Sequence, residues 1–167
     1  KGIFGDGFDY EAVRSKRVEL MDNYVEKNGI EVKSGAKELL SFLKENGYKV
    51  ALATATPPQR AERYLKAHDL YKYFDVTVSA SMVSVGKPAP DIYLKAAEML
   101  GLSPQNCVAL EDSPNGIKSA SSAGCVTVMV PDLDKPSNDI IPLLHGVADG
   151  LSDVKRILRE LEDCNIQ

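Results

Sequence analysis

The sequence is short of long apolar runs and of basic residues, and each shortage excludes a class of protein. No apolar segment approaches the roughly 20 residues of a membrane-spanning helix, and residues 1–4 are too few for the apolar core of a secretory signal. With 20 basic and 24 acidic residues the net charge is −4, which argues against a surface for nucleic acid or anionic membranes. We therefore expect a cytoplasmic protein whose partners include neither nucleic acid nor a membrane.

Cysteine and histidine are also scarce. Two of the three cysteines, Cys107 and Cys125, fall inside apolar, strand-like segments, which indicates buried thiols in a reducing compartment and not a disulfide framework. The two histidines, His68 and His145, do not have the spacing of metal ligands relative to the other candidate side chains. We expect neither disulfides nor a histidine metal site.

What the sequence does contain is an alternation of short apolar runs and helical patterns. Its 167 residues, 44% hydrophobic and 26% charged, suit one globular domain. Strands that alternate with helices are typical of a parallel sheet covered on both faces, so we predict a three-layer α/β/α, Rossmann-like core. The predicted strands are residues 50–53, 75–80, 107–110 and 125–130, and the predicted helices of the core are residues 36–46, 59–68, 91–100, 114–122 and 153–162.

A boundary is predicted near the start of the chain. Residues 11–27 carry apolar side chains at helical spacing, and Asn28-Gly29 ends the pattern. Glycines at both ends of residues 29–35 indicate a break, which divides the chain into a helical segment, residues 1–30, and the α/β core, residues 31–167. Ser34 and Ser152 are predicted to cap the helices that follow them.

The richest segment is residues 107–124, where a predicted strand is followed by Glu111-Asp112 and then by a helix with Ser113 as N-cap and Pro114 at its first position. Two carboxylates about 4 Å apart repel by roughly 4 kcal/mol at an effective dielectric near 20, so the pair is expected to share a proton or bind a cation. Hard oxygen ligands suit Mg²⁺. The alternative is a solvated first turn that complements the helix dipole.

Two other residues follow predicted strands, at the sheet edge where open α/β sheets bind ligands. The Thr54 hydroxyl, with the backbone amides of Ala55 and Thr56, can hold a phosphate oxygen, although it can equally be a capping residue. Lys87 lies in a loop stiffened by Pro88 and Pro90 and suits an anionic substrate, although most lysines are simply solvated. A Thr, a Lys and an acidic pair, each after its own strand, together favour a phosphate and metal site.

The ordered segments VALAT (residues 50–54), SVGKPAPDIY (residues 84–93) and LEDSPNGIKSASSAG (residues 110–124) resemble the haloacid dehalogenase-like superfamily, and in particular its helical-cap, β-phosphoglucomutase-like branch. In that family an aspartate is phosphorylated and then discharged to water or to a second acceptor. The resemblance implies that Thr54 binds the phosphoryl group, that Lys87 neutralises its charge, and that Glu111 and Asp112 hold Mg²⁺. Ser113 and Asn115 are predicted to orient the acidic pair.

The sequence departs from the family pattern at its start, since no Asp-x-Asp-Gly motif for the nucleophile occurs in it. The nearest candidate, Asp6 and Asp9 within residues 2–9, has the carboxylates three apart instead of two. We expect instead that residues 1–30 are a remnant of the helical cap, and that the first strand of the family, which lies centrally in the sheet, is supplied by another segment. Direct pairing of residues 50–53 with residues 107–110 would contradict this expectation.

The leading hypothesis is an Mg²⁺-dependent phosphatase that acts on a small phosphorylated metabolite, such as a sugar phosphate, through an aspartate outside this chain. A phosphomutase is the alternative, disfavoured because Pro57-Pro58 offers no polar side chain after Thr54. If the chain is complete, a non-catalytic metal-binding or phosphate-binding module becomes the better hypothesis. The dehalogenase reaction is disfavoured because it leaves the acidic pair without a purpose, and a receiver domain is disfavoured because its acidic pair comes first in the chain. The sequence leaves the oligomeric state open.

Overall fold

The computed structural model describes residues 7–164. The chain divides into two compact units, of which the first ends at Val32 and the second begins at Lys33. The first unit contains one helix, α1 (Tyr10–Asn28), as predicted for residues 11–27. Asp9 caps this helix by accepting a hydrogen bond from the Ala12 backbone amide at 2.9 Å. No side chain of α1 is fully buried, and none of the described helices is long and apolar enough to cross a membrane.

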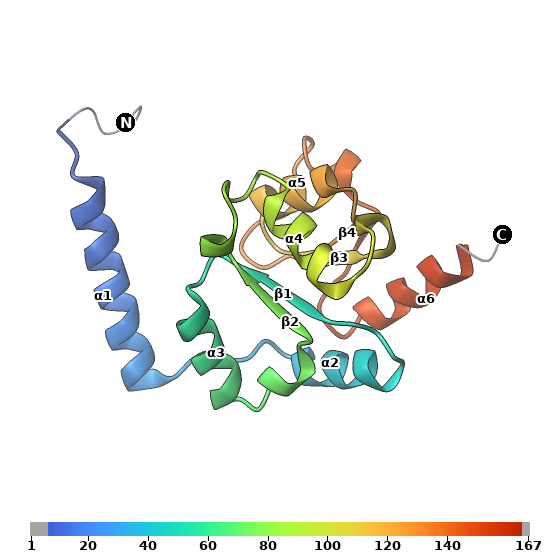
Figure 1. Ribbon diagram of the computed structural model, residues 1–167, viewed down its shortest axis with the longest axis horizontal. Coiled ribbons are helices and arrows are strands. Elements are labelled where there is room, and N and C mark those ends of the chain that lie inside the picture. Colours follow the sequence, from blue (N-terminus) through green and yellow to red (C-terminus); the bar gives the residue numbers. More distant parts are fainter. Residues whose placement is uncertain (1–6, 165–167) are drawn as a thin grey trace. The chain divides into compact units, whose positions relative to one another are not determined.

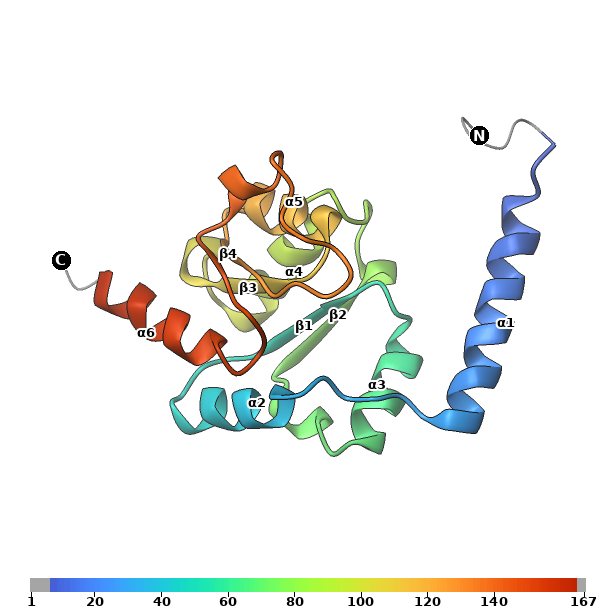
Figure 2. The same cartoon turned by 180° about the vertical axis from the view of Figure 1, so that it is seen from behind.

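The second unit contains short parallel strands in two sheets (Figure 1). Strand β1 (Ala51–Thr54) pairs with β2 (Val76–Ser79), and the two lie side by side in both views (Figure 2). Strand β3 (Val108–Glu111) pairs with β4 (Val126–Met129), which also pairs with the two-residue strand β5 (Gly146–Val147). Among the described residues, β1 does not pair with β3. Such pairing would have contradicted the expectation that another segment supplies a central strand.

Helices cover both faces of these sheets. Helix α4 packs its buried Ile92 and Ala96 against Val78 of β2, and α5 packs Ala120 and Ala123 against β3 on the same side. The predicted α/β fold with parallel strands and covering helices is therefore confirmed. The helices of this unit are α2 (Ala36–Glu45), α3 (Pro58–Ala67), α4 (Asp91–Leu100), α5 (Pro114–Ala123) and α6 (Val154–Cys164).

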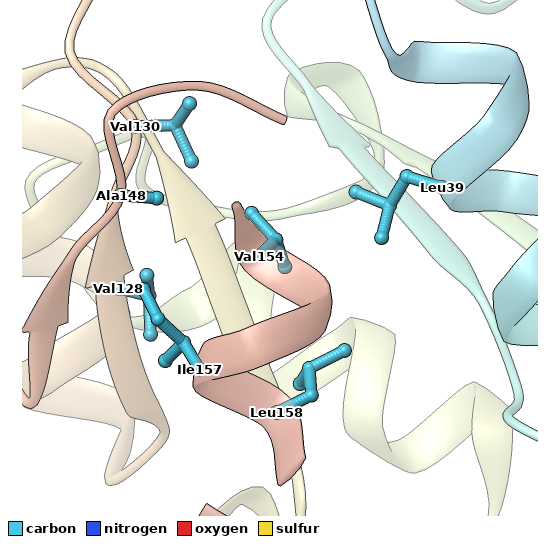
Figure 3. Packing of buried hydrophobic residues seen from close by; sticks show 7 residues of the cluster. All are labelled: Leu39, Val128, Val130, Ala148, Val154, Ile157 and Leu158. Atoms are coloured by element: carbon cyan, nitrogen blue, oxygen red, sulfur yellow. The ribbon is translucent and has the colours of Figure 1, made fainter. Parts of the chain in front are cut away.

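The largest apolar cluster lies on the opposite face of the three-stranded sheet (Figure 3). Leu39 of α2 and Val154 of α6 meet Val128 of β4 there, because alternate side chains of a strand point to opposite faces. The remaining buried members of the cluster are Val130, Ala148, Ile157 and Leu158. Helices α2 and α6 thus form one outer layer, and α4 and α5 form the other.

Several local predictions differ from the structure. The predicted cap Ser34 is wrong, since the N-cap of α2 is Gly35, which has a φ of 81° and no side chain to make a capping bond. A Cβ at Gly35 would lie 3.0 Å from the backbone nitrogen of Ser152, so this close approach favours glycine. Helix α6 begins at Val154, one residue later than predicted, and β5 was not predicted because two residues carry no periodic pattern.

Candidate active site

Lys87 lies in the chain segment between β2 and α4. Its ammonium group contacts residues near the carboxyl ends of both sheets. Its Nζ donates a hydrogen bond to the Ala53 carbonyl of β1 at 3.3 Å and forms an ion pair with Glu111 at the end of β3. It also donates to the Tyr93 hydroxyl at 3.3 Å. The Lys87 side chain is 20% exposed and that of Glu111 is 7% exposed, so water screens this pair only weakly.

Glu111 is the last residue of β3. The sequence pattern predicts instead that Glu111 follows the strand. Its carboxylate accepts hydrogen bonds from Lys87, from the Tyr93 hydroxyl and, at 3.2 Å, from the Ser113 hydroxyl. Burial raises the pKa of Glu111, but the hydrogen bonds from Lys87 and Tyr93 outweigh burial and lower the pKa below its ordinary value. Glu111 is therefore a buried anion at neutral pH, stabilised by three donors.

The first turn of α5 leaves room for this carboxylate. Ser113 caps the helix, as predicted, by accepting a hydrogen bond from the Gly116 amide at 3.1 Å. Gly116 is buried, and a Cβ added to it would overlap the carboxylate of Glu111. Sequence reasoning missed the role of Gly116, although a glycine in a helical turn, which costs about 1 kcal/mol relative to alanine, is the signal that could have indicated it.

The other predicted site residues lie around this cluster without joining its hydrogen bonds. Thr54 is the last residue of β1, and its hydroxyl accepts a hydrogen bond from the Thr56 amide at 3.0 Å, which orders the turn into α3. Ala55, Asp112 and Asn115 are exposed. Among the described residues, the side chains of Asp112 and Asn115 make no hydrogen bond to Glu111.

The residues present fit a metal ion in part. Asp112 directly follows Glu111 and is exposed, and one oxygen of Glu111, Oε2, accepts only the 3.2 Å hydrogen bond from Ser113, so both residues retain oxygen lone pairs for a hard cation. No group of three or more His, Cys, Asp or Glu side chains that could hold a metal occurs among the described residues. This chain thus offers two carboxylates toward a metal site.

The described cysteines are free and are poor nucleophiles. Burial raises the pKa of Cys125 to about 11, and burial also raises the pKa of Cys107. Both thiols are therefore protonated at neutral pH. The chemistry of the site rests on Lys87, Glu111 and the polar groups beside them.

Comparison with known proteins shows the family of this chain. The family model of haloacid dehalogenase-like hydrolases matches residues 4–124. The phosphorylated carbohydrates phosphatase of Thermotoga maritima is 40% identical over 124 residues, which are 74% of this chain and 50% of that protein. Hexitol phosphatase B of Escherichia coli is 40% identical over 97 residues, 58% of this chain and 44% of that protein.

Among solved structures, a putative β-phosphoglucomutase from Thermotoga maritima has a TM-score of 0.77 at 32% identity and covers 93% of this chain and 72% of that one. The chain belongs to the haloacid dehalogenase-like hydrolases, in their β-phosphoglucomutase-like branch. It spans about half the length of the curated relatives that it matches.

Proposed function

We propose that the protein to which this chain belongs is an Mg²⁺-dependent phosphatase of small phosphorylated carbohydrates. The observation that carries the proposal is the Lys87–Glu111 pair at the carboxyl ends of β1 and β3. A fixed ammonium beside carboxylates is suited to phosphoryl transfer, whose main demands are positioning and the stabilisation of negative charge. The names of the two phosphatases that are 40% identical support the substrate class.

Each residue has a proposed role. Thr54 and the Ala55 amide bind the transferring phosphoryl group, and Lys87 neutralises its charge. Glu111 and Asp112 hold Mg²⁺, and Ser113 keeps Glu111 in place through its 3.2 Å hydrogen bond. Bound Mg²⁺ would supply charge stabilisation at the phosphoryl oxygens. The exposed Asn115 has the least direct proposed role, which is to orient Asp112.

The nucleophile is proposed to come from a strand between β1 and β3. Among the described residues, β1 pairs only with β2 and β3 only with β4, so one edge of each strand offers backbone donors and acceptors to a further parallel strand. An aspartate at the carboxyl end of that strand would lie near Lys87, which bonds to Ala53 on one side and to Glu111 on the other. Residues 2–6 of the nearest sequence candidate lie outside the described residues, and Asp9 caps α1. Residues 1–30 are proposed to belong to the helical cap.

The test measures phosphate release from a panel of sugar phosphates by the full-length protein, with Mg²⁺ and with EDTA. We expect turnover that needs Mg²⁺ and that falls by about 10²-fold or more in Lys87→Ala and in Asp112→Asn. Lys118→Ala is the matched control, because Lys118 also forms an ion pair, with the exposed Asp139 at 2.9 Å. Equal rates in all four proteins would refute the assignment.

The same assay separates a phosphatase from a phosphomutase. A phosphatase releases inorganic phosphate, whereas a mutase returns an isomeric sugar phosphate without net release. Phosphomutase is the alternative, since the similar solved structure is named a putative β-phosphoglucomutase. Isomerisation faster than phosphate release would favour that alternative, and absence of both reactions with retained Mg²⁺ binding would favour a non-catalytic module.

A further inference from the structure

Tyr93 has no role in the proposed function, and its side chain contacts residues of both sheets. It is the third residue of α4, and its ring packs against two separate apolar clusters. One cluster belongs to β2 and α4, and the other belongs to β3, α5 and the residue before β4. The buried members are Val78, Ile92 and Ala96 in the first cluster, and Ala109, Ala120, Ala123 and Cys125 in the second. The position of the ring is therefore fixed relative to both sheets.

The Tyr93 hydroxyl connects the two charged groups of the site. It donates a hydrogen bond to Glu111 and accepts one from Lys87 Nζ at 3.3 Å. The same Nζ lies 5.0 Å from the centroid of the Tyr93 ring, within the range of a cation–π contact. Burial, and after it the charge of Glu111, raises the pKa of Tyr93 far above its ordinary value, so the phenol remains protonated.

These contacts give the phenol a role that the ion pair cannot fill by itself. An ammonium and a carboxylate attract each other in many orientations, because a lysine side chain has a flexible stem and a point charge. The rigid phenol contacts both groups in the arrangement that the structure shows. In that arrangement Lys87 still reaches the Ala53 carbonyl at the end of β1.

We propose that Tyr93 is a positioning residue that holds the Lys87 ammonium and the Glu111 carboxylate in the geometry needed for phosphoryl transfer. The role in transfer rests on the proposed phosphatase function. The effect on the geometry of the pair does not, because it follows from the contacts of the ring and the hydroxyl. The two parts can therefore be tested separately.

The experiment compares the full-length wild-type protein with Tyr93→Phe, which removes the hydroxyl and keeps the ring. The first measurement is NMR relaxation of the Lys87 side chain, with its resonances assigned from a Lys87→Gln sample. The second is kcat and KM for Mg²⁺-dependent phosphate release. We expect a more mobile Lys87 ammonium and a kcat about tenfold lower, as for the loss of one hydrogen bond to a charged group, with KM changed less than about threefold.

Tyr64→Phe is the matched control, because the Tyr64 hydroxyl is also buried but has no hydrogen-bond partner among the described residues. It should leave kcat and Lys87 mobility at their wild-type values. Unchanged Lys87 mobility and unchanged kcat in Tyr93→Phe would overturn the proposal, whatever the change in unfolding temperature. A wild-type protein without phosphatase activity, combined with increased Lys87 mobility in Tyr93→Phe, would refute the proposed function and support the positioning role.

Discussion

The Glu111 carboxylate occupies the space that a side chain on Gly116 would need. Glu111 ends β3 and Gly116 lies in the first turns of α5, and the Ser113 hydroxyl bonds to both residues, as donor to Glu111 at 3.2 Å and as acceptor from the Gly116 amide at 3.1 Å. The absence of a Cβ lets this buried anion lie directly against the helix. The packing of the Glu111 carboxylate against α5 therefore depends on Gly116.

Gly116→Ala should consequently destabilise the protein and displace Glu111. The added methyl group overlaps a carboxylate that three hydrogen bonds hold in place, and overpacking of this kind costs about 1–3 kcal/mol in the free energy of unfolding. Alanine gains about 1 kcal/mol over glycine in a helix, so we expect a net loss of up to about 2 kcal/mol. Urea unfolding measures the change. Gly150→Ala is the control, since a Cβ at Gly150 meets no atom within 4 Å and should change stability by less than about 0.5 kcal/mol. Equal stabilities of the two variants would contradict the close packing of Glu111 on α5.

A second prediction concerns the coupling between Lys87 and Glu111. Lys87→Met leaves a buried carboxylate without its cation, which should lower the free energy of unfolding by about 3 kcal/mol. In Lys87→Met/Glu111→Gln the buried charge is also gone, so the double variant should lose at least about 1 kcal/mol less than the sum of the single losses. A double-mutant cycle by urea unfolding checks this. Strict additivity would show that the two groups do not interact.

The pH dependence of stability provides a third prediction. The pKa of Glu111 is lower in the folded state than the value of about 4.3 expected for an unfolded chain. Ionised Glu111 thus stabilises the fold above pH 4.3, and this contribution is lost as the pH falls through the folded pKa. The stability difference between wild type and Glu111→Gln should be largest near pH 7 and shrink on acidification below about pH 4.3.

Urea unfolding at several pH values measures this difference, and Asp139→Asn serves as a comparison. Lys118 holds the pKa of Asp139 at about 2, but the Asp139 side chain is 63% exposed. Its effect should have the same sign and be smaller, because solvent screens an exposed pair. A difference for Glu111→Gln that grows toward low pH would be the opposite of the expected result.

The fourth prediction tests the layer formed by α2 and α6. Leu39 is 3% exposed and lies among the side chains of the cluster in Figure 3. Leu39→Ala should lower the free energy of unfolding by about 2–5 kcal/mol, because it removes buried apolar surface and leaves a cavity. Leu133→Ala is the same substitution at a side chain that is 95% exposed, and thermal unfolding should barely change there. Similar losses in both variants would argue against the packing of α2 on the sheet.

Much of the fold could be predicted from the sequence because its signals are local. The apolar runs, the cap at Ser113 and the proline-started helices predict most elements to within one or two residues, since capping and periodicity act over a few positions. Strand β5 and the cap of α2 were missed for the reverse reason. Both depend on neighbours far along the chain, such as Val128 beside Gly146 and Ser152 beside Gly35.

The candidate site also has some features that local sequence signals predict and others that depend on residues distant in the chain. The sequence by itself determined which chemical groups follow the strands, namely Thr54, Lys87, Glu111 and Asp112, because strand ends can be read from local patterns. Only the tertiary structure decided that Glu111 is buried and bonded to Lys87 and Tyr93 whereas Asp112 is exposed, and that Gly116 leaves room for the carboxylate. The physical reason is that burial and hydrogen bonding depend on the packing of α4 and α5 against two sheets, which residues distant in sequence create together.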